Sequence, residues 1–421
     1  MKEATNLGEG LVLAYLVSQY PAVSHTFILR EIHQLRQLGI AIRTASIEPS
    51  TPGPNGFTEA ESREAAATFC VKTRSPLRIV LDHATCFARR PRAYLAGLVS
   101  AFRLAGLDLK AVLYHLVYFA EAVTVGEWMR RNALPHLHVH FANAAATVAL
   151  LVKKTHGIPY SVTVHGSDEF YGIEFYRLRE KVAGASLVCC VSRFTRSQLM
   201  KASPREHWGK LEVCPLGVDP AVFKPVGSRA GDAFEILCVG RLVPAKGHSV
   251  LLAAVARLTG RGRRVQLSLV GDGPDRQALE SIAAGLNIRE RVHFHGSVNQ
   301  DRILEFLERA DAFVLLSFAE GIPVCLMEAM AMEIPCIATF VGGIPELIQS
   351  GEDGILVPAS DSDLVADAIA KLIDDSDFRF RLGRRARRKI VEQYNLGANT
   401  ESLASLFERR LGLKRRAAGG A

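Results

Sequence analysis

Two glutamates eight residues apart form the most specific chemical pattern in the sequence. Glu320 follows an apolar, strand-like run and Glu328 lies about one turn into the next helical stretch, so both carboxylates can face the same ligand. The helix entry between them offers free N–H groups and a dipole that suit a phosphate. We expect one carboxylate to take ribose hydroxyls and the other to hold a sugar hydroxyl. The helix-entry residues are Gly321, Ile322, Pro323 and Val324.

Two cations form a second pattern. A strand-like run ends at Val239, a glycine turn follows at Gly240, and Arg241 and Lys246 flank the start of a helical stretch. A guanidinium can bind an anion through two parallel hydrogen bonds, and an ammonium adds a point charge. The segment lacks the Gly-x-x-x-x-Gly-Lys-Ser/Thr spacing of a P-loop. We predict that the two cations clamp a diphosphate opposite the Glu320 loop.

Histidines supply the remaining candidates. His165 follows a strand-like run, so it should lie at the carboxyl end of a sheet, whereas Asp168 could equally cap the next helix. His138 and His140 form a His-x-His pair, but no further ligand is spaced to complete a metal site. We interpret this pair as structural and predict no bound metal.

The elements that must position these residues follow a β-α-β rhythm. Short apolar runs alternate with helical periodicity almost throughout, which predicts parallel sheets covered by helices. The rhythm restarts after a segment rich in proline and glycine between Pro215 and Gly231. The sequence therefore predicts an α/β protein with two Rossmann-like domains facing each other across a cleft, where ligands bind at the strand ends. The predicted units are residues 1–222, residues 223–394, and a final helix and basic tail at 395–421 returning to the first domain.

Charge is unevenly distributed along the chain. The net charge is +8, and the segment Arg379–Ala421 holds 12 Lys or Arg against 3 Glu, so the first 378 residues are nearly neutral. This pattern excludes a uniformly basic, nucleic-acid-binding surface, and we predict no nucleic-acid partner.

A second basic segment, Lys72–Arg131, holds ten basic and four acidic residues with interleaved apolar side chains. It could be a set of helices covering the sheet with a solvated outer face, or a face that docks on anionic lipid. If the last helix returns to the first domain, both basic regions could lie on one side of the molecule. The residues that suggest docking are Arg89, Arg90, Arg92, Phe87, Tyr94, Leu95, Leu98, Phe102, Leu113, Tyr114 and Phe119.

Nothing in the sequence indicates export. The apolar run Leu11–Val17 is short for a signal core, and the most apolar later stretch, Ala111–Val125, is interrupted by His115 and Glu121. The eight cysteines include no Cys-x-x-Cys pair, and most lie in or beside apolar runs, as free thiols do in a reducing compartment. We expect a cytoplasmic protein.

In order and spacing these motifs resemble the glycosyltransferases of family 4, which are retaining enzymes of the GT-B fold. The resemblance covers most of the chain, and the opening segment Ser18–Glu31 is similar to a branch that builds bacterial exopolysaccharides. That branch often has Glu where this chain has His25. The motifs that carry the resemblance are Pro215–Asp219, Gly240–Leu242 with Lys246 and Gly247, His165–Asp168, Val270–Pro274, Glu320–Glu328 and Gly342–Glu346.

The resemblance implies a role for each candidate. Arg241 and Lys246 would hold the donor's diphosphate, Glu328 the ribose and Glu320 the transferred sugar. His165 would bind that sugar beside the reacting carbon. The remaining donor-side candidates are Gly240, the helix entry Gly321–Val324 and Val298, whose loop would touch the base, and the acceptor-side candidates are His25 and Asp168.

The resemblance also implies a mechanism. Double displacement would need a carboxylate beneath the sugar, and the sequence offers no persuasive candidate. The family mechanism is front-face departure, in which the leaving diphosphate accepts the acceptor's proton while Arg241, Lys246 and the helix at Val324 stabilise its charge. The Asp-x-Asp runs at Asp361 and Asp375 fall in late helical stretches. We predict that the reaction needs neither metal nor cofactor.

The sequence thus predicts a retaining glycosyltransferase that moves a sugar from a UDP- or GDP-linked donor to a saccharide or lipid-linked acceptor in polysaccharide biosynthesis. It would work in the cytoplasm, at the inner face of the plasma membrane if the basic segments contact anionic lipid. The alternatives are another enzyme of the same fold, such as a nucleotide-sugar epimerase or a sucrose- or trehalose-type synthase, and a non-catalytic membrane-binding protein.

Overall fold

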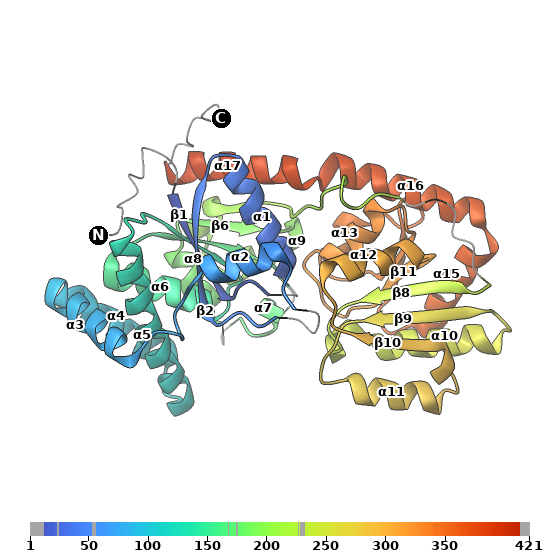
Figure 1. Ribbon diagram of the computed structural model, residues 1–421, viewed down its shortest axis with the longest axis horizontal. Helices are drawn as coiled ribbons and strands as arrows, with labels where there is room; N and C mark the ends of the chain where they lie inside the picture. Colours follow the sequence, from blue (N-terminus) through green and yellow to red (C-terminus); the bar gives the residue numbers. More distant parts are fainter. Residues whose placement is uncertain are drawn as a thin grey trace.

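The computed structural model describes residues 12–22, 25–52, 56–166, 168–173, 176–225, 227 and 232–412, with side chains at all of these except Asp168 and Tyr171. Two domains lie side by side along the long axis of the molecule, each a parallel β-sheet covered by helices (Figure 1). The predicted class, α/β with two Rossmann-like domains, is confirmed.

The first sheet has the strand order β3-β2-β1-β4-β5-β6-β7, and every neighbouring pair is parallel. Helices cover both faces of the sheet, which is why the central strand β1 is apolar and buried over Val12–Val17 without alternation. The strands are β1 (Val12–Gln19), β2 (Ala41–Glu48), β3 (Phe69–Cys70), β4 (Leu137–His140), β5 (Tyr160–Val164), β6 (Leu187–Cys190) and β7 (Leu211–Val213).

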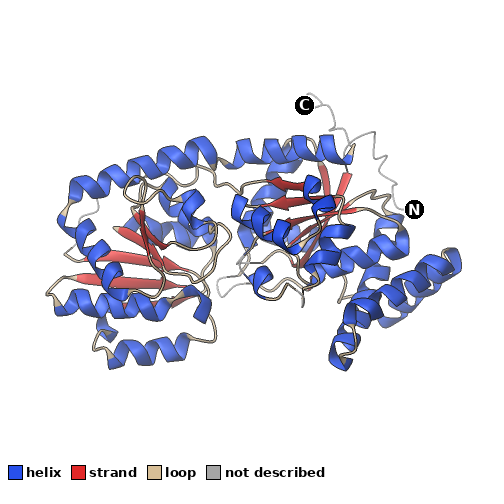
Figure 2. Ribbon diagram, turned by 180° about the vertical axis from the view of Figure 1, so that it is seen from behind, coloured by secondary structure: helices blue, strands red, loops and turns tan. Residues whose placement is uncertain are grey.

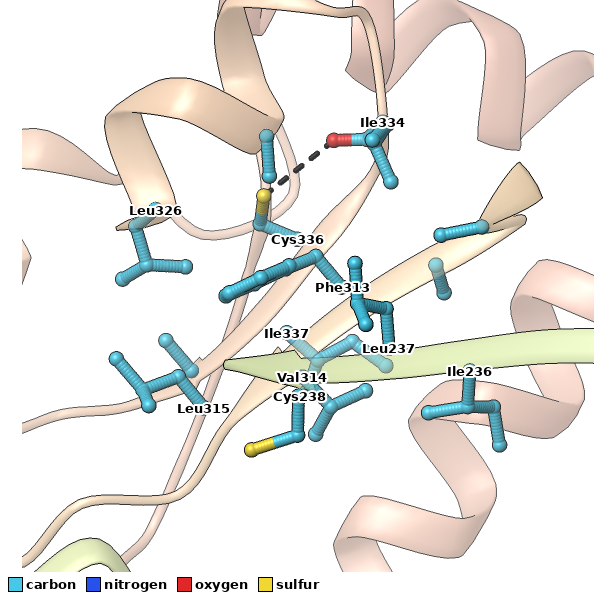
Figure 3. Close-up of a cluster of buried hydrophobic side chains, with 14 of the residues drawn as sticks. Ile236, Leu237, Cys238, Phe313, Val314, Leu315, Leu326, Ile334, Cys336 and Ile337 are labelled. Carbon is cyan, nitrogen blue, oxygen red and sulfur yellow. Dashed lines mark hydrogen bonds between the residues drawn. The ribbon is translucent and has the colours of Figure 1, made fainter. Parts of the chain in front are cut away.

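The second sheet has the order β10-β9-β8-β11-β12-β13, again parallel throughout. Its strands are β8 (Phe234–Val239), β9 (Val265–Val270), β10 (Val292–Gly296), β11 (Ala312–Leu315), β12 (Cys336–Thr339) and β13 (Ile355–Val357). In the core of this domain, side chains of β8, β11 and β12 pack against Leu326, and the Cys336 thiol donates to the Ile334 carbonyl at 3.3 Å (Figure 3).

Side-chain caps start many of the helices. Ser192 accepts a hydrogen bond from the N–H of Thr195, and Thr58 forms a capping box with Glu61. The helices of the first domain are α1 (Thr26–Gln37), α2 (Glu59–Ala67), α3 (Pro76–Arg89), α4 (Pro91–Ala105), α5 (Leu109–Arg131), α6 (Ala144–His156), α7 (Asp168–Tyr171), α8 (Leu178–Gly184) and α9 (Arg193–Ala202). The later helices are α10 (His248–Gly260), α11 (Arg276–Gly285), α12 (Gln300–Arg309), α13 (Val324–Ala331), α14 (Ile344–Leu347), α15 (Ser362–Asp374), α16 (Ser376–Gln393) and α17 (Leu396–Leu411).

The last two helices span both domains. Helix α16 lies along the second domain, and α17 continues across the first (Figure 1). Leu403 and Phe407 of α17 share a buried cluster with Leu13 and Tyr15 of β1. The boundaries at residues 222/223 and 394/395 stay a prediction.

The strand orders fix where a ligand should bind. The direction of winding reverses between β1 and β4 in the first sheet and between β8 and β11 in the second. Ligands of open α/β sheets bind beside the strand ends at such reversals. The segments that leave β1, β8 and β11 carry His25, Arg241 and Glu320, and the segment that leaves β5, the neighbour of β4, carries His165.

The two basic regions lie far apart. Helices α3, α4 and α5 project from the end of the first domain that is distant from the second, whereas α16, with the basic segment Arg379–Lys389, lies on the second domain (Figures 1 and 2). The prediction that both regions share one side is therefore wrong for Arg379–Lys389, whereas Arg409 and Arg410 lie in the last turn of α17, on the first domain (Figure 1). The terminal residues Lys414, Arg415 and Arg416 lie outside the described residues.

Candidate active site

Lys246 and Glu320 form an ion pair between two strand ends of the second domain. Lys246 closes a 3-10 turn (Pro244–Lys246) after β8, and its Nζ donates to Glu320 Oε1, which also accepts from Ser317 Oγ at 2.6 Å. Burial alone would lower the pKa of Lys246, but the adjacent carboxylate raises it above its usual range. The carboxylate therefore keeps the Lys246 ammonium charged in a largely buried place, and a charged ammonium can donate to a diphosphate.

Arg241 precedes the same turn by three residues and is exposed. Its charge reaches the first domain, because burial, His140 and Arg241 together lower the pKa of His25 to about 4. Gly240 precedes Arg241 where the backbone is crowded: a Cβ on the neighbouring Gly271 would lie 1.9 Å from the Gly240 carbonyl oxygen. The structure thus brings both predicted cations to the face where the domains meet.

The entry of α13 touches the first domain. Pro323 is the N-cap of α13, Val324 is its first residue, and Ile322 is buried. A Cβ at Gly321 would lie 1.7 Å from the carbonyl oxygen of His165, so only glycine allows the two loops to meet. The helix N-terminus, with its partial positive charge, therefore opens beside His165.

Glu328 lies one turn into α13 and is buried. Its Oε1 accepts from Arg30 Nη2 of the first domain at 2.8 Å and from Gln300 Nε2 at 3.5 Å. Burial raises the pKa of the Glu328 carboxyl, and the Arg30 guanidinium offsets part of that rise. Val298 lies two residues before Gln300, in the loop after β10, half-buried against the second core.

His165 belongs to a buried chain of polar side chains. Its Nε2 lies 3.1 Å from His140 Nδ1, His140 Nε2 lies 3.2 Å from Glu31 Oε1, and Tyr15 donates to the same oxygen at 3.0 Å. A carboxylate oxygen accepts hydrogen bonds, so His140 Nε2 donates to Glu31 and, with His140 as a neutral ring, its Nδ1 accepts from His165 Nε2. Burial lowers the pKa of His165 well below its ordinary value. His165 is therefore a neutral imidazole with Nδ1 as an acceptor.

The acceptor-side candidates are only partly placed. His25 is the N-cap residue of α1, its ring packs near Phe27 and Phe141, and its buried Nδ1 has no hydrogen-bond partner in the part of the chain that is described. Asp168 is the first residue of α7, but its side chain lies outside the described residues.

Sequence reasoning missed several polar residues that hold the site. Glu169, one position after Asp168, accepts from the backbone N–H groups of His165 at 2.8 Å and Gly166 at 2.7 Å. Burial raises the pKa of Glu169 to about 7, although these hydrogen bonds oppose the rise. An acidic residue one turn after a strand end, beside a glycine, was the available signal.

Glu346, the last residue of the Gly342–Glu346 motif, also supports the site. Its two carboxylate oxygens accept from the backbone N–H groups of Arg193 at 2.9 Å and Phe194 at 2.7 Å, the first residues of α9 in the other domain. A carboxylate at a helix N-terminus is stabilising. No signal in the sequence pairs positions so far apart.

Two groups of side chains have the donor types of metal sites. One ligand atom from each of Glu31, His138 and His140 lies within 4.8 Å of the others, and the same holds for Cys86, Glu127 and His156. In the first group both nitrogens of each histidine are already in hydrogen bonds: His138 with Ser161 and Thr163, and His140 with Glu31 and His165. The fold thus brings a carboxylate, Glu31, beside the His-x-His pair, which the sequence spacing did not predict. The ring nitrogens of both histidines are occupied by hydrogen bonds to neighbouring side chains.

The Asp-x-Asp runs lie at helix starts. Asp361 accepts from the N–H groups at the beginning of α15, and Asp375 does the same for α16. Both carboxylates therefore cap helices.

Two family models match adjoining parts of the chain. The model described as "Glycosyltransferase Family 4" matches residues 83–222, and the model described as "Glycosyl transferases group 1" matches residues 222–389. The two matches meet inside the segment that joins the sheets.

Named proteins are similar over long stretches. The chain is 30% identical over 307 residues, 68% of its length and 79% of the other, to a GDP-mannose-dependent alpha-(1-6)-phosphatidylinositol monomannoside mannosyltransferase of Mycobacterium tuberculosis. It is 26% identical over 419 residues, 94% of its length and 99% of the other, to an Escherichia coli protein provisionally named as a colanic acid biosynthesis glycosyltransferase, WcaL. Among solved structures, Anabaena HepE in complex with UDP-glucose aligns with a TM-score of 0.71 at 18% identity, over 95% of this chain and 100% of that one.

Proposed function

The chain belongs to the family 4 glycosyltransferases, and from this premise we propose that it transfers a hexose from a UDP- or GDP-linked donor to a saccharide or lipid-linked acceptor, with retention at the anomeric carbon. One observation supports the proposal most strongly. The Lys246–Glu320 pair, the N-terminus of α13 and the His165 loop, which come from three strand ends, lie in contact.

In this proposal the donor lies along the second domain. Arg241, Lys246 and the α13 N-terminus hold the diphosphate, Glu328 takes the ribose and the loop at Val298 touches the base. Glu320 is held by Lys246 and Ser317 and accepts a sugar hydroxyl. The bare Nδ1 of His165 accepts another, because Nε2 carries the proton.

The proposed mechanism follows from the pairing of the two carboxylates. Glu320 is bound to a lysine and Glu328 to an arginine, which makes each a poor nucleophile. The C–O bond to the leaving diphosphate breaks on the same face from which the acceptor oxygen attacks, and the diphosphate takes the acceptor's proton. Fixed positive charge beside the leaving oxygen stabilises the transition state.

Nucleotide binding tests the donor proposal. The similar mannosyltransferase is named for GDP-mannose and HepE is bound to UDP-glucose, which supports these two nucleotides as candidates. Calorimetric titration of the full chain with UDP, GDP and ADP should show tight binding of UDP or GDP, weakened in Lys246→Ala. Equal affinity of wild type and variant for every nucleotide would contradict the proposal.

The exposed surface of α3, α4 and α5 supports a membrane-associated acceptor. Large apolar side chains are exposed on these helices and the turn between α4 and α5, among them Leu77, Leu95, Leu107, Leu109 and Leu113. Monomeric soluble proteins rarely expose many such side chains together. We propose that this surface, the insert face, docks on the anionic inner face of the plasma membrane of a bacterium making a polysaccharide.

The structure corrects the residues assigned to this face. Tyr94, Leu98 and Phe119 pack against the first core, and Arg90 donates to the His156 carbonyl. The basic side chains that are exposed there, with no ion pair in the described part of the chain, are Arg89, Arg92, Arg103 and Lys110. By length and apolar composition, α5 alone among the described helices could cross a membrane, but residues such as Val123 and Met129 lie in the first core, as in a helix of a soluble protein.

Vesicle co-sedimentation tests the insert face. Wild type should bind anionic vesicles more than neutral ones, and less at high salt, because exposed charges are screened beyond roughly 8 Å at physiological ionic strength. Changing Arg89, Arg92 and Arg103 to Ala should reduce binding, whereas changing Arg384 and Arg388 of α16 should not. Equal binding to both lipids, or equal loss in both variants, would contradict this part of the proposal.

A further inference from the structure

Arg30 connects the first domain to the carboxylate proposed to bind ribose. It lies in α1, and its Nη2 donates to Glu328 Oε1 of α13 at 2.8 Å. The side chains are 16% and 7% exposed, so the pair is largely removed from water. The guanidinium also lies 5.1 Å from the ring centroid of Phe223, in the segment between the domains. This fixes the guanidinium from two sides where the domains meet.

The contact leaves one carboxylate oxygen available. Arg30 and Gln300 both donate to Oε1 of Glu328, and Oε2 has no hydrogen-bond partner among the residues the structure describes. A carboxylate accepts through both oxygens. Arg30 itself is incompletely satisfied, because its Nη1 is buried without a hydrogen-bond partner in the described part of the molecule. The pair is thus arranged to receive a further polar group.

The positive charge of Arg30 also favours the binding of a further polar group by Glu328. Burial raises the pKa of Glu328, and Arg30 is the group that lowers it. Without a cation beside it, a buried carboxyl takes up a proton more readily and accepts hydrogen bonds less strongly. A ribose hydroxyl donating to Oε2 would therefore be bound more tightly while Arg30 is in place.

We propose that Arg30 is a positioning residue of the donor site: it reaches across from the first domain, holds Oε1 of Glu328, and leaves Oε2 for the ribose hydroxyls. This inference rests on the proposed function, because it takes Glu328 as the ribose-binding residue. It follows that the ribose subsite is complete only when the two domains are in contact.

If Arg30 only joined the two domains, its loss would weaken the binding of a nucleotide equally with and without ribose hydroxyls. The experiment is calorimetric titration of the full chain with whichever of UDP and GDP binds wild type, and with its 2′,3′-dideoxy form. Arg30→Met should weaken binding of the ribonucleotide about tenfold, the effect of losing one charge-assisted contact. It should weaken binding of the dideoxy form about twofold or less, and Arg30→Lys should restore most of the affinity.

Two further measurements separate a positioning role from a folding defect. In a Glu328→Gln background Arg30→Met should have little further effect, because the two act through one hydrogen bond. In the Arg30→Met variant affinity should fall as the pH is lowered from neutrality, while wild type changes less. Arg63→Met, which removes an exposed ion pair with Glu59, is the matched control and should behave as wild type.

The outcomes distinguish the two proposals. Equal weakening for ribo- and dideoxynucleotide, or additive losses with Glu328→Gln, overturns the positioning role while leaving the proposed function standing. Failure of wild type to bind any nucleotide overturns the proposed function and this inference with it.

Discussion

Gly321 and His165 meet across the domain interface, where a Cβ on Gly321 would lie 1.7 Å from the His165 carbonyl oxygen. One residue enters α13 of the second domain and the other leaves β5 of the first. The contact places the helix N-terminus, with its partial positive charge, beside a neutral imidazole. The proposed active site therefore exists only while these two loops touch.

Substitution of Gly321 by Ala should separate the loops and lower turnover on the order of a hundredfold, since a displacement of about 1 Å at a reacting centre has that effect. The thermal midpoint should change little if the domains can shift apart. Gly285→Ala is the matched control, because a Cβ there meets nothing within 4 Å. Wild-type turnover in Gly321→Ala would show that the contact is not needed.

Removal of either proposed clamp residue should lower turnover strongly. Arg241→Ala and Lys246→Ala should each reduce kcat by about 10²–10³, the usual effect of losing one group that stabilises transition-state charge. Lys201→Ala, at an exposed position on α9, should leave kcat unchanged. The clamp assignment fails if both variants turn over as fast as wild type.

Activity should survive EDTA. In this account Arg241, Lys246 and the α13 N-terminus supply the positive charge that a divalent ion supplies elsewhere. The measurement is turnover before and after chelation and dialysis, with Mg²⁺ or Mn²⁺ added back. Complete loss that the added metal restores would mean that the diphosphate is held in another way.

The protein should lose stability in mild acid. Burial is the main cause that lowers the pKa values of His25, His136 and His248 to about 4. Between pH 4 and 6.5 the unfolded chain therefore binds more protons at these sites than the native one, and stability rises with pH by about 1.4 kcal/mol per pH unit for each histidine. Glu121 and Glu169, with pKa values raised to about 7 mainly by burial, act in the opposite sense.

The histidines outnumber these glutamates, and His138 and His165, whose pKa values burial also lowers, add to them. The urea midpoint should therefore be lower at pH 5 than at pH 7. A midpoint at pH 5 equal to or above that at pH 7 would show that these histidines do not remain neutral in the folded protein.

Much of the fold is predictable because strand and helix periods are local. The apolar runs Tyr160–Val164, Val265–Val270 and Cys336–Thr339 can be recognised as strands in the sequence, and they coincide with β5, β9 and β12. The residues that carry chemistry were found at strand ends because parallel sheets collect their ligand groups there. Lys246 and Glu320 could be placed together on that rule alone.

The residues that hold the site side chains in place could not be predicted in the same way. Arg30 and Glu328 are 298 positions apart, and His140 and Glu31 are 109 apart. Such pairs depend on how two domains and distant strands pack, which a local period does not encode. The two interpretations of the insert stayed open for a related reason: its aromatic residues divide between core and surface, and composition alone does not say that Phe119 of α5 is buried while Phe102 of α4 is exposed.

Hydrolysis of the donor in the absence of acceptor tests most directly whether a nucleotide sugar reacts where the two domains meet. A panel of UDP- and GDP-linked hexoses would be incubated with wild type and with Lys246→Ala, and free nucleoside diphosphate would be measured. Wild type should release nucleoside diphosphate slowly from one donor class, and Lys246→Ala should lower that rate by about 10²–10³. Release that Lys246→Ala leaves unchanged, or no release from any donor, would contradict the proposed function.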